Sequence, residues 1–294
     1  MPPKIYVTYN KYNGDLRAMP SYLERLEVSA VKVVNSHPDN PKKFKLPMVM
    51  ATIILVDPKN GAALSILSGT WITAMRTGAA GGIAAKYLAR KDSKIIGLVG
   101  AGTQARTQLM ALLSLYGRLE EVRVWSRSEE SRKKYVSEME IVCGERARIL
   151  PVKNVKDAVA DADIIVTTTP SRKPLVSDEW ISDGTHITCI GADAPGKEEL
   201  DPSILTHAKI YVDDWEQCSH SGEINVPLAE GIITKENVCG ELGEVVAGLK
   251  PGRTLSSEIT VFTSTGLAVQ DAVTAKLACE KALAKNLGRW IEMA

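Results

Sequence analysis

The stretch KIIGLVGAGTQA, at residues 94–105, restricts the fold of this chain more than any other. Its apolar first half, Ile95 to Val99, is typical of a strand buried on both faces of a parallel sheet. Its second half is a G-x-G-x-x-A turn from Gly100 to Ala105, and leucines at helical spacing follow. In dinucleotide-binding units such a turn lets the backbone approach a pyrophosphate, and the helix N–H groups face the phosphates. The sequence therefore predicts a nucleotide site at Gly100 and Gly102, the alternative being a glycine turn that merely begins a helix.

Further apolar strand patterns alternate with short helical patterns through the middle of the chain. The expected strands are at 122–125, 148–152, 164–169, 186–190, 210–212 and 259–262, and the expected helices at 129–142 and 155–160. This alternation predicts an α/β fold, with a doubly wound parallel sheet and helices on both faces.

The two ends of the chain differ from this middle part. Residues 1–70 have strand and turn character, with strands expected at 5–9, 28–34, 48–56 and 62–67 in a small antiparallel sheet. A helix rich in Ala and Gly follows at 71–90, where three glycines require close packing against another backbone or a bound dinucleotide. A last helix begins near Gly266 and is expected to run almost to the end of the chain. Its expected apolar face consists of Leu267, Val269, Ala272, Val273 and Leu277. We expect this helix to return to the first domain.

Composition narrows the class of partner. The 36 basic and 35 acidic residues give a formal charge of +1, which provides no electrostatic bias toward nucleic acid or an anionic membrane. The amino terminus lacks a signal-peptide pattern, and no stretch approaches the roughly 18 uninterrupted apolar residues of a membrane span. The five cysteines and four histidines show no metal-ligand spacing, so we expect reduced buried thiols and no metal. We therefore expect a soluble cytoplasmic protein whose partner is a small molecule.

The end of the second parallel strand bears on the choice of cofactor. NAD-selective sites carry an acidic residue there, about 20 residues beyond the glycine turn, which binds the adenosine ribose. Here that place is taken by Ser126, Arg127 and Ser128. A guanidinium and hydroxyl groups attract the 2′-phosphate of NADP, so this loop favours NADP over NAD. If Arg127 is a solvated loop residue, the choice is made elsewhere.

Several charged residues are candidates for chemistry. Asp193 follows the strand at 186–190, at the edge where parallel sheets bind ligands, although an aspartate there can also cap a turn. Lys4, Arg17 and Lys32 lie within or beside apolar sequence of the first segment. Arg76 lies inside an apolar helix, where its charge needs either a carboxylate or a bound anion. A carboxylate beside a hydride carrier, together with several cations, fits the oxidation of an amino acid.

The chain resembles the ornithine cyclodeaminase and mu-crystallin family, and within it the archaeal enzymes that act on alanine. The resemblance covers nearly the whole chain and rests on the segments PPKIYV, GDLRAMP, KVVNSHPDNP, TAMRTGAAGGIAAKYLAR, GAGTQA, TTTPSRKP, THITCIGADAPGKEELD, GEIN, GEVVAGLKPGR and ITVFTSTGLAVQD. It implies a homodimeric oxidoreductase that converts L-alanine reversibly to pyruvate and ammonia. It also implies that residues 1–91 and 263–294 form a substrate-binding and dimerisation domain, and that residues 92–262 form an NAD(P)-binding Rossmann domain.

The same resemblance implies a role for individual residues. Lys4 and Arg17 are expected to bind the substrate carboxylate, Lys32 to donate and accept the proton, and Asp193 to position water or ammonia. The residues expected to contact the cofactor are Arg76, Thr77, Gly100, Gly102, Thr103, Gln104, Ser126, Arg127, Ser128, Thr168, Thr169, Ile190, Gly191, Lys197 and Ser264. A bound pyrophosphate would then compensate the charge of Arg76.

Two other activities of the family are open. A reductase of cyclic imines such as Δ1-pyrroline-2-carboxylate needs the same carboxylate-binding cations and the same hydride carrier. Ornithine cyclodeaminase, which makes proline, carries a glutamate two residues before the Met-Pro pair to hold the distal amine, and this chain has Arg17 there. A cation at this position repels the ornithine ammonium group, so the residue disfavours the lyase.

We expect the Michaelis constant for NADPH to be lower than that for NADH, because Arg127 attracts the additional phosphate and the loop has no acidic residue to repel it. Steady-state assays with each cofactor at saturating oxo acid and ammonia measure both constants. Comparable values for the two cofactors would refute this assignment of Ser126, Arg127 and Ser128.

Overall fold

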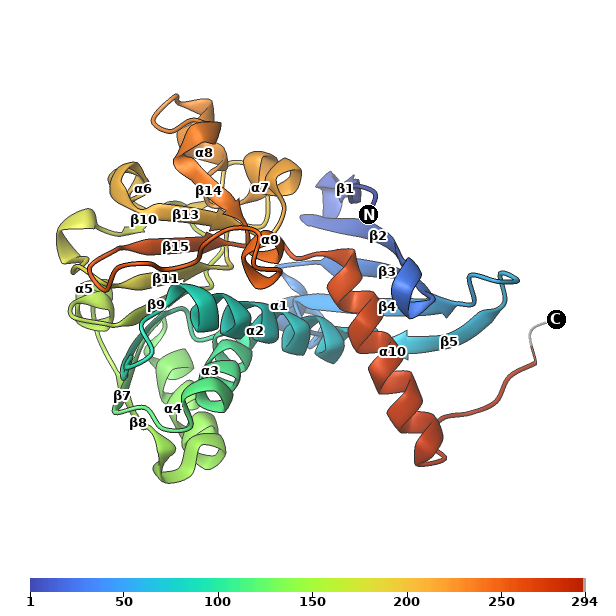
Figure 1. Cartoon of the computed structure of the whole chain (residues 1–294). Helices are drawn as coiled ribbons and strands as arrows, with labels where there is room; N and C mark the ends of the chain where they lie inside the picture. The colour runs from blue at the N-terminus through green and yellow to red at the C-terminus, as the bar shows by residue number, and fades with distance from the viewer. Residues whose placement is uncertain (293–294) are drawn as a thin grey trace. The chain divides into compact units, whose positions relative to one another are not determined.

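The computed structural model of the chain describes residues 1–292, which divide into two compact units (Figure 1). Unit 1 comprises Met1–Arg76 together with the segment from Gly266 onward, and unit 2 comprises Thr77–Thr265. Helix α2 (Gly69–Leu88) begins in unit 1 and ends in unit 2. From the sequence we expected the whole helix to belong to the first domain, whereas the boundary between the two units falls inside it, between Arg76 and Thr77.

Unit 1 contains a five-stranded antiparallel sheet with its strands in chain order. The strands are β1 (Ile5–Tyr9), β2 (Gly14–Leu23), β3 (Val28–Ser36), β4 (Val49–Val56) and β5 (Ala63–Ser68), and a short helix α1 (Asn40–Lys43) lies between β3 and β4. Asn13 and Glu27 take left-handed backbone conformations in the short connections that reverse the chain. The small antiparallel sheet expected from the sequence is confirmed.

Strand β2 was not expected, because Pro20 and the charged residues near it obscure its pattern. Pro20 pairs with Val31 of β3, while β1 reaches along β2 only as far as Ala18. A proline has no N–H to donate and is tolerated in a strand where no neighbour needs that donor. The ten-residue strand therefore accommodates its proline beyond the end of β1.

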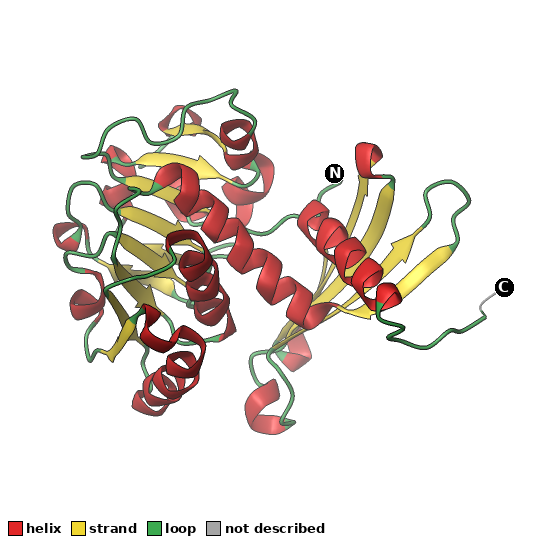
Figure 2. Ribbon diagram, turned by 60° about the horizontal axis from the view of Figure 1, so that its bottom comes forward, coloured by secondary structure: helices red, strands yellow, loops and turns green. Residues whose placement is uncertain are grey.

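Helix α10 (Ala268–Ala284) lies across one face of this sheet, as Figure 2 shows. Its buried residues are Ala268, Asp271, Ala272 and Ala275. The apolar face expected from the sequence is wrong in part, since Ala272 is buried but Val273 and Leu277 are exposed, and the helix ends at Ala284. Alanines allow the helix to approach the sheet closely, and the buried aspartate finds ionic partners there.

Unit 2 contains an eight-stranded parallel sheet, which confirms the expected fold class. Its strands, in spatial order, are β14 (Val238–Glu241), β13 (Lys209–Val212), β15 (Thr260–Thr263), β11 (His186–Cys189), β9 (Ile164–Thr167), β6 (Ile95–Val99), β7 (Glu121–Trp125) and β8 (Arg148–Pro151). The order reverses between β6 and β9, since the chain proceeds outward from β6 through β7 to β8 and then returns to β9. Ligands of open parallel sheets bind at the carboxyl edge beside such a reversal.

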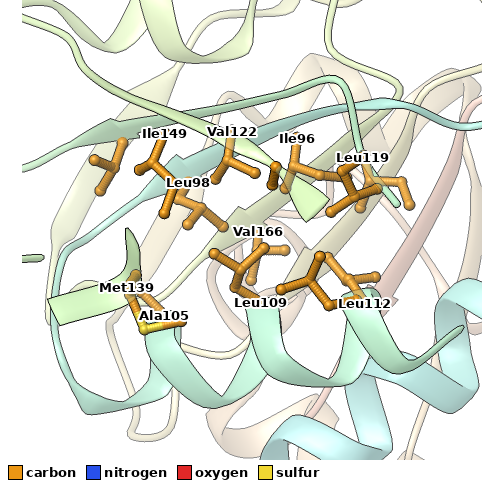
Figure 3. Close-up of a cluster of buried hydrophobic side chains, with 14 of the residues drawn as sticks. Ile96, Leu98, Ala105, Leu109, Leu112, Leu119, Val122, Met139, Ile149 and Val166 are labelled. Carbon is orange, nitrogen blue, oxygen red and sulfur yellow. The ribbon is translucent and has the colours of Figure 1, made fainter. Parts of the chain in front are cut away.

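Helices cover both faces of this sheet, as expected. One core joins alternate residues of β6, β7 and β9 to α2, to α3 (Thr103–Tyr116) and to α4 (Glu129–Cys143), and Figure 3 shows part of it. A second core on the other face includes residues of α5 (Val155–Val159), α6 (Pro202–His207) and α7 (Trp215–Ser221). Ile96 and Leu98 belong to the first core and Val99 to the second, which is the alternation of a strand buried on both faces.

A few short elements complete unit 2, and the strands among them were not expected from the sequence. They are β10 (Arg172–Val176) and β12 (Glu198–Leu200), which form a two-stranded parallel pair, and the helices α8 (Asn225–Ala229) and α9 (Leu242–Val246). Strand β14 was also missed. These elements are too short to show a hydrophobic period.

The glycines of α2 are explained by the close approach of α3. A Cβ at Gly78 would overlap the Thr107 carbonyl, one at Gly81 would overlap the Gln108 amide, and one at Gly82 would lie 2.9 Å from the Ala111 Cβ. The Gln108 amide also donates a hydrogen bond of 2.9 Å to the Thr77 carbonyl. The expected close packing against another backbone is therefore confirmed.

The thiols differ in part from the expectation. All five cysteines are free, and Cys143, Cys189 and Cys218 are buried, but Cys239 is exposed. None of the helices within residues 1–292 combines the length and the apolar character that a membrane span requires.

Replacing Gly78 by alanine should lower the free energy of unfolding by about 1–3 kcal/mol, because the new methyl group overlaps α3 even though alanine has the higher helix propensity. Denaturant titration of the purified variant measures the change. Gly243→Ala is the control, since a Cβ at Gly243 meets no atom within 4 Å and should be neutral or stabilising by up to about 1 kcal/mol. Equal effects of the two substitutions would argue against the close approach of the helices.

Candidate functional site

The glycine turn lies where the sequence placed it, between β6 and α3. Gly100 has a φ of +122°, and a Cβ there would overlap the Thr168 hydroxyl. Gly102 is the N-cap of α3 and provides no side chain to cap the first N–H groups, while a Cβ on it would meet no atom within 4 Å. The turn thus combines a backbone that needs glycine with an open approach to the uncapped start of a 14-residue helix. Thr103 and Gln104 are the first two residues of this helix.

The loop after β7 lies next to the turn. The Gly100 N–H donates a hydrogen bond of 2.9 Å to the Trp125 carbonyl, which immediately precedes Ser126. Arg132 donates to the Ser126 carbonyl, and Ser128 caps α4 by accepting a hydrogen bond from the Ser131 N–H. Arg127 itself is exposed. Backbone contacts therefore bring the start of this loop beside the glycine turn, and the cofactor role of Ser126, Arg127 and Ser128 stays a prediction.

The loops after β9 and β11 lie on the other side of the turn. The Thr168 N–H donates to the Val99 carbonyl at 2.9 Å, and the Ile190 N–H donates to the Thr167 carbonyl at 2.9 Å. These bonds continue the sheet ladder past its last paired residues. Thr168, Thr169, Ile190 and Gly191 therefore all lie at the carboxyl edge of unit 2.

Asp193 follows Gly191 in this loop and forms an ion pair of 2.6 Å with Lys197. The sequence analysis assigned separate roles to these two residues, and the structure brings them into direct contact. At the end of β15, the Ser264 hydroxyl donates a hydrogen bond of 2.7 Å to Asp213, which also accepts one from the Thr265 N–H. Asp213 was not singled out from the sequence. It could have been recognised as an acidic residue that directly follows the apolar strand Lys209–Val212.

In unit 1 the candidate cations share one face of the sheet. Lys32 is opposite Met19 in the register, Arg17 is two residues before Met19, and Tyr6 is opposite Arg17. Side chains two residues apart on a strand point to the same face, so Arg17 and Lys32 share the face that α10 covers. Lys4 has the same parity as Tyr6, and its charge acts on Lys32.

Arg17 is already partly paired. It forms an ion pair with Asp15, with Nε 2.9 Å from Oδ1 and Nη2 3.2 Å from Oδ2, and its guanidinium carbon lies 5.5 Å from the centre of the Tyr6 ring. This ion pair and the ring fix the orientation of the guanidinium on the sheet face.

Lys32 is almost completely buried and contacts a carboxylate that the sequence analysis did not single out. Its Nζ lies 2.6 Å from Oδ2 of Asp271, and each side chain is 1% exposed. The two atoms are ionic partners, although their angles fall outside those of a hydrogen bond. Asp271 also accepts a 3.0 Å hydrogen bond from Nε of Arg76 through Oδ1, and Nη1 of Arg76 donates to Gln270 at 3.0 Å.

Of the two partners considered for Arg76, a carboxylate or a bound anion, the structure shows a carboxylate, and contact with a cofactor stays a prediction. Arg76 is 7% exposed and already has Asp271 as a counterion within unit 1. The sequence did contain a signal for these ion pairs, because a buried charge requires a partner of opposite sign. That signal was the occurrence of three charged residues in otherwise apolar sequence, namely Lys32, Arg76 and Asp271.

The surroundings of Lys32 lower its pKa from 10.5 to about 7. Burial is the largest cause, followed by the positive charge of Arg76; Asp271 opposes both, and Lys4 contributes a further decrease. An amine with this pKa exchanges its proton near neutral pH, which is what a general acid and base requires.

The two units thus offer complementary chemistry. Unit 2 presents backbone donors and an open glycine turn, which suit a dinucleotide phosphate. Unit 1 presents four cations, namely Lys4, Arg17, Lys32 and Arg76. Arg17 pairs with Asp15, and both Lys32 and Arg76 pair with Asp271, so the positive charges outnumber the negative charges. Such a set can bind a carboxylate and move a proton.

Comparison with known proteins places this geometry among related enzymes. The sequence pattern of the ornithine cyclodeaminase/mu-crystallin family matches residues 1–286. The alanine dehydrogenase of Archaeoglobus fulgidus is 51% identical over 292 residues, which cover 99% of this chain and 87% of that protein.

Two solved structures extend the likeness to three dimensions. An archaeal alanine dehydrogenase dimer with bound NAD has a TM-score of 0.93 and 51% identity, covering 100% of this chain and 88% of that one. The Δ1-pyrroline-2-carboxylate reductase of Thermococcus litoralis, in complex with NADH and L-proline, has a TM-score of 0.95 and 45% identity, covering 99% and 89%.

Replacing Asp271 by asparagine should lower the pKa of Lys32 below about 7, because it removes the negative charge that opposes burial and the charge of Arg76. NMR titration of protein carrying ¹³C at the lysine ε carbons reads this pKa directly. Asp15→Asn is the matched control, since it removes the ion pair of Arg17 on the same sheet. A Lys32 pKa that is the same in the Asp271 variant as in the wild type would contradict the assignment.

Proposed function

We propose, because the chain belongs to the ornithine cyclodeaminase/mu-crystallin family, that it is a nicotinamide-dependent alanine dehydrogenase. It would convert L-alanine reversibly to pyruvate and ammonia. The observation that carries the proposal is the buried Lys32, whose pKa lies near neutrality and which belongs to the cations of unit 1. Unit 2 of the same chain carries an open glycine turn. The relatives named alanine dehydrogenase support the choice of substrate.

The glycine turn of unit 2 fits the cofactor. The uncapped start of α3 and the open space at Gly102 suit the pyrophosphate, with Gly100, Thr103 and Gln104 beside it. When bound, the nicotinamide supplies the acceptor for the hydride that leaves the alanine Cα. The solved relatives hold NAD or NADH, which supports NAD, while Arg127 and its neighbouring hydroxyls support NADP.

The remaining cofactor residues are proposed from their place on the carboxyl edge of unit 2. This group comprises Ser126, Ser128, Thr168, Thr169, Ile190, Gly191, Lys197 and Ser264. Thr77, which lies in α2 and accepts a hydrogen bond from Gln108 of α3, is proposed with them. Arg76, whose charge Asp271 already compensates, would contribute its remaining donors to an anionic group.

Lys4 and Arg17 are proposed to bind the substrate carboxylate. Arg17 is held by Asp15 and Tyr6, and a guanidinium fixed in this way loses little side-chain entropy when it binds an anion. Lys4 adds a second positive charge on the same sheet face. Alanine has only a methyl side chain, so these charges provide the main handle for orienting it.

Lys32 is proposed to move the proton. In the oxidative direction its neutral amine accepts a proton as water adds to the imine carbon, and in the reductive direction its ammonium form returns it. Asp193, oriented by Lys197, would position the water or ammonia.

A homodimer in the cytoplasm is proposed as the state of the protein. A solved relative is a dimer, and the face of the unit 1 sheet away from α10 leaves Leu64 and Ile66 exposed, at 58% and 59%. Residues of this size are usually buried in an interface when they lie together on one face. The five free thiols support the cytoplasm.

Reduction of cyclic imines is the second candidate function. The reductase from Thermococcus litoralis supports it, since its solved complex contains L-proline. The substrate carboxylate and the hydride chemistry are the same in both reactions, so Lys4, Arg17 and Lys32 would keep their roles.

We expect the purified protein to consume NADH or NADPH faster with pyruvate and ammonia than with Δ1-pyrroline-2-carboxylate. A spectrophotometric assay at 340 nm compares the two substrates under equal conditions. Faster turnover of the cyclic imine would reverse the order of the two candidates, and proline formed from ornithine without net reduction would replace both by the lyase.

In the same assay, Lys32→Ala should reduce kcat by at least about 100-fold, because it removes the group that transfers the proton. Lys59→Ala is the control, since Lys59 is exposed and pairs only loosely with Glu27, at 3.4 Å. If the Lys32 variant kept wild-type turnover, the catalytic assignment would be lost.

A further inference from the structure

Two buried glutamates link the loops at the carboxyl edge of unit 2, and the proposed reaction assigns no role to either of them. Glu199 in β12 has no exposed surface, and Glu223, just after α7, is 1% exposed. Both belong to segments that the sequence analysis singled out, GKEELD and GEIN, without giving either carboxyl group a function.

Glu199 joins the loop after β9 to the loop after β11. Its Oε1 accepts hydrogen bonds from the Thr169 N–H at 2.6 Å and from the Thr169 hydroxyl at 2.7 Å. Its Oε2 accepts one from the Gly191 N–H at 3.1 Å. A Cβ at Gly191 would overlap both the Thr169 carbonyl and this carboxylate oxygen, so the two loops are packed tightly around Glu199.

Glu223 holds the strand that carries Glu199. Its Oε1 accepts hydrogen bonds of 2.7 Å from the N–H groups of Glu199 and Leu200, and its own N–H donates to the Thr263 hydroxyl at 2.9 Å. Nearby, Asn225 accepts from the Gly196 N–H at 2.8 Å and donates to the Lys197 carbonyl at 2.9 Å. The GEIN segment therefore supports the whole loop that runs from Gly191 to Leu200.

The hydrogen bonds distinguish the charge states of the two glutamates. Both oxygens of Glu199 accept from donors, which is the role of a carboxylate. Among the described residues Oε2 of Glu223 has no hydrogen-bond partner, so this oxygen can carry a proton. Two neighbouring buried carboxyl groups do not both ionise, because burial and mutual repulsion favour the neutral form of one.

We propose that Glu199 is a positioning residue of the nucleotide site, whose carboxylate holds the loops after β9 and β11 in the arrangement that the nicotinamide half of the cofactor requires. This inference rests on the proposed function, because it assumes that unit 2 binds the dinucleotide. Glu223 acts as a neutral support that fixes the backbone of β12.

The proposal has a consequence for the pH dependence of binding. Burial raises the pKa of Glu199 to about 7, although the hydrogen bonds from Thr169 and Gly191 lower it. Burial and the charge of Glu199 together raise the pKa of Glu223 well above its usual value. The other groups near the pair are Glu198 on the same strand and the thiols of Cys189 in β11 and Cys218 in α7, which burial keeps neutral. As pH falls through about 7, Glu199 takes up a proton and loses acceptor capacity, so the affinity for nucleotide should fall.

Fluorescence titration of the full-length protein with NADH measures this affinity without relying on turnover. We expect the dissociation constant of the wild type to rise as pH falls from about 8.5 to about 6. Glu199→Gln should raise it about ten-fold at the upper pH and remove most of its pH dependence, because the amide places a donor against one of the loop donors. Glu120→Gln is the matched control, since Glu120 is 60% exposed, precedes β7 and pairs with Lys94, so this variant should stay within about two-fold of the wild type.

The outcomes separate this proposal from the proposed function. Wild-type affinity in Glu199→Gln, or a wild-type dissociation constant that does not change with pH, would overturn the role of Glu199 and leave the function standing. Failure of the wild type to bind NADH and NADPH at any pH would overturn both. If Glu199→Gln does not fold, as judged by circular dichroism, the pH titration of the wild type and of Glu120→Gln decides the question.

Discussion

The ion pairs that Asp271 makes with Lys32 and Arg76 determine which parts of unit 1 can pack together, because two cations are buried there on separate elements. Breaking a buried ion pair by removing one partner costs about 3–5 kcal/mol. The carboxylate comes from α10, near the end of the chain, and the cations come from β3 and α2. The proposed catalytic lysine therefore keeps its environment only when the carboxyl-terminal helix is in place.

Sequence patterns predicted the elements that repeat a clear period. The strand Ile95–Val99, its glycine turn and the alternation that follows were all recognised, because each buried strand is an apolar run bounded by turn residues. Strands β2, β10, β12 and β14 were missed. Pro20 interrupts the first, and the other three are too short to show a pattern. The buried face of α10 was predicted mainly from its large apolar residues, whereas the residues that are buried are three alanines and one aspartate.

The candidate site was predictable to a smaller extent. Residues that follow parallel strands, such as Thr168 and Asp193, could be placed at one edge of the sheet because the topology requires it. The partners of these residues could not be predicted, since they come from distant segments. Glu199 and Glu223 look like ordinary surface acids in the sequence GKEELD and GEIN, and only the folded chain shows that they are buried under two loops.

Strand β15 is the last strand within residues 1–292, yet it lies between β11 and β13 in the parallel sheet. Strand β13 pairs only with β15 and β14, so β13 and β14 cannot join the sheet before residues 260–263 have left the ribosome. Without β15 the sheet would consist of the five strands from β11 to β8 with an open edge at β11, and such unpaired edges favour association with other chains. Because α10 follows β15 directly, one continuous segment, residues 260–284, supplies a central strand of unit 2 and the helix that packs on the sheet of unit 1.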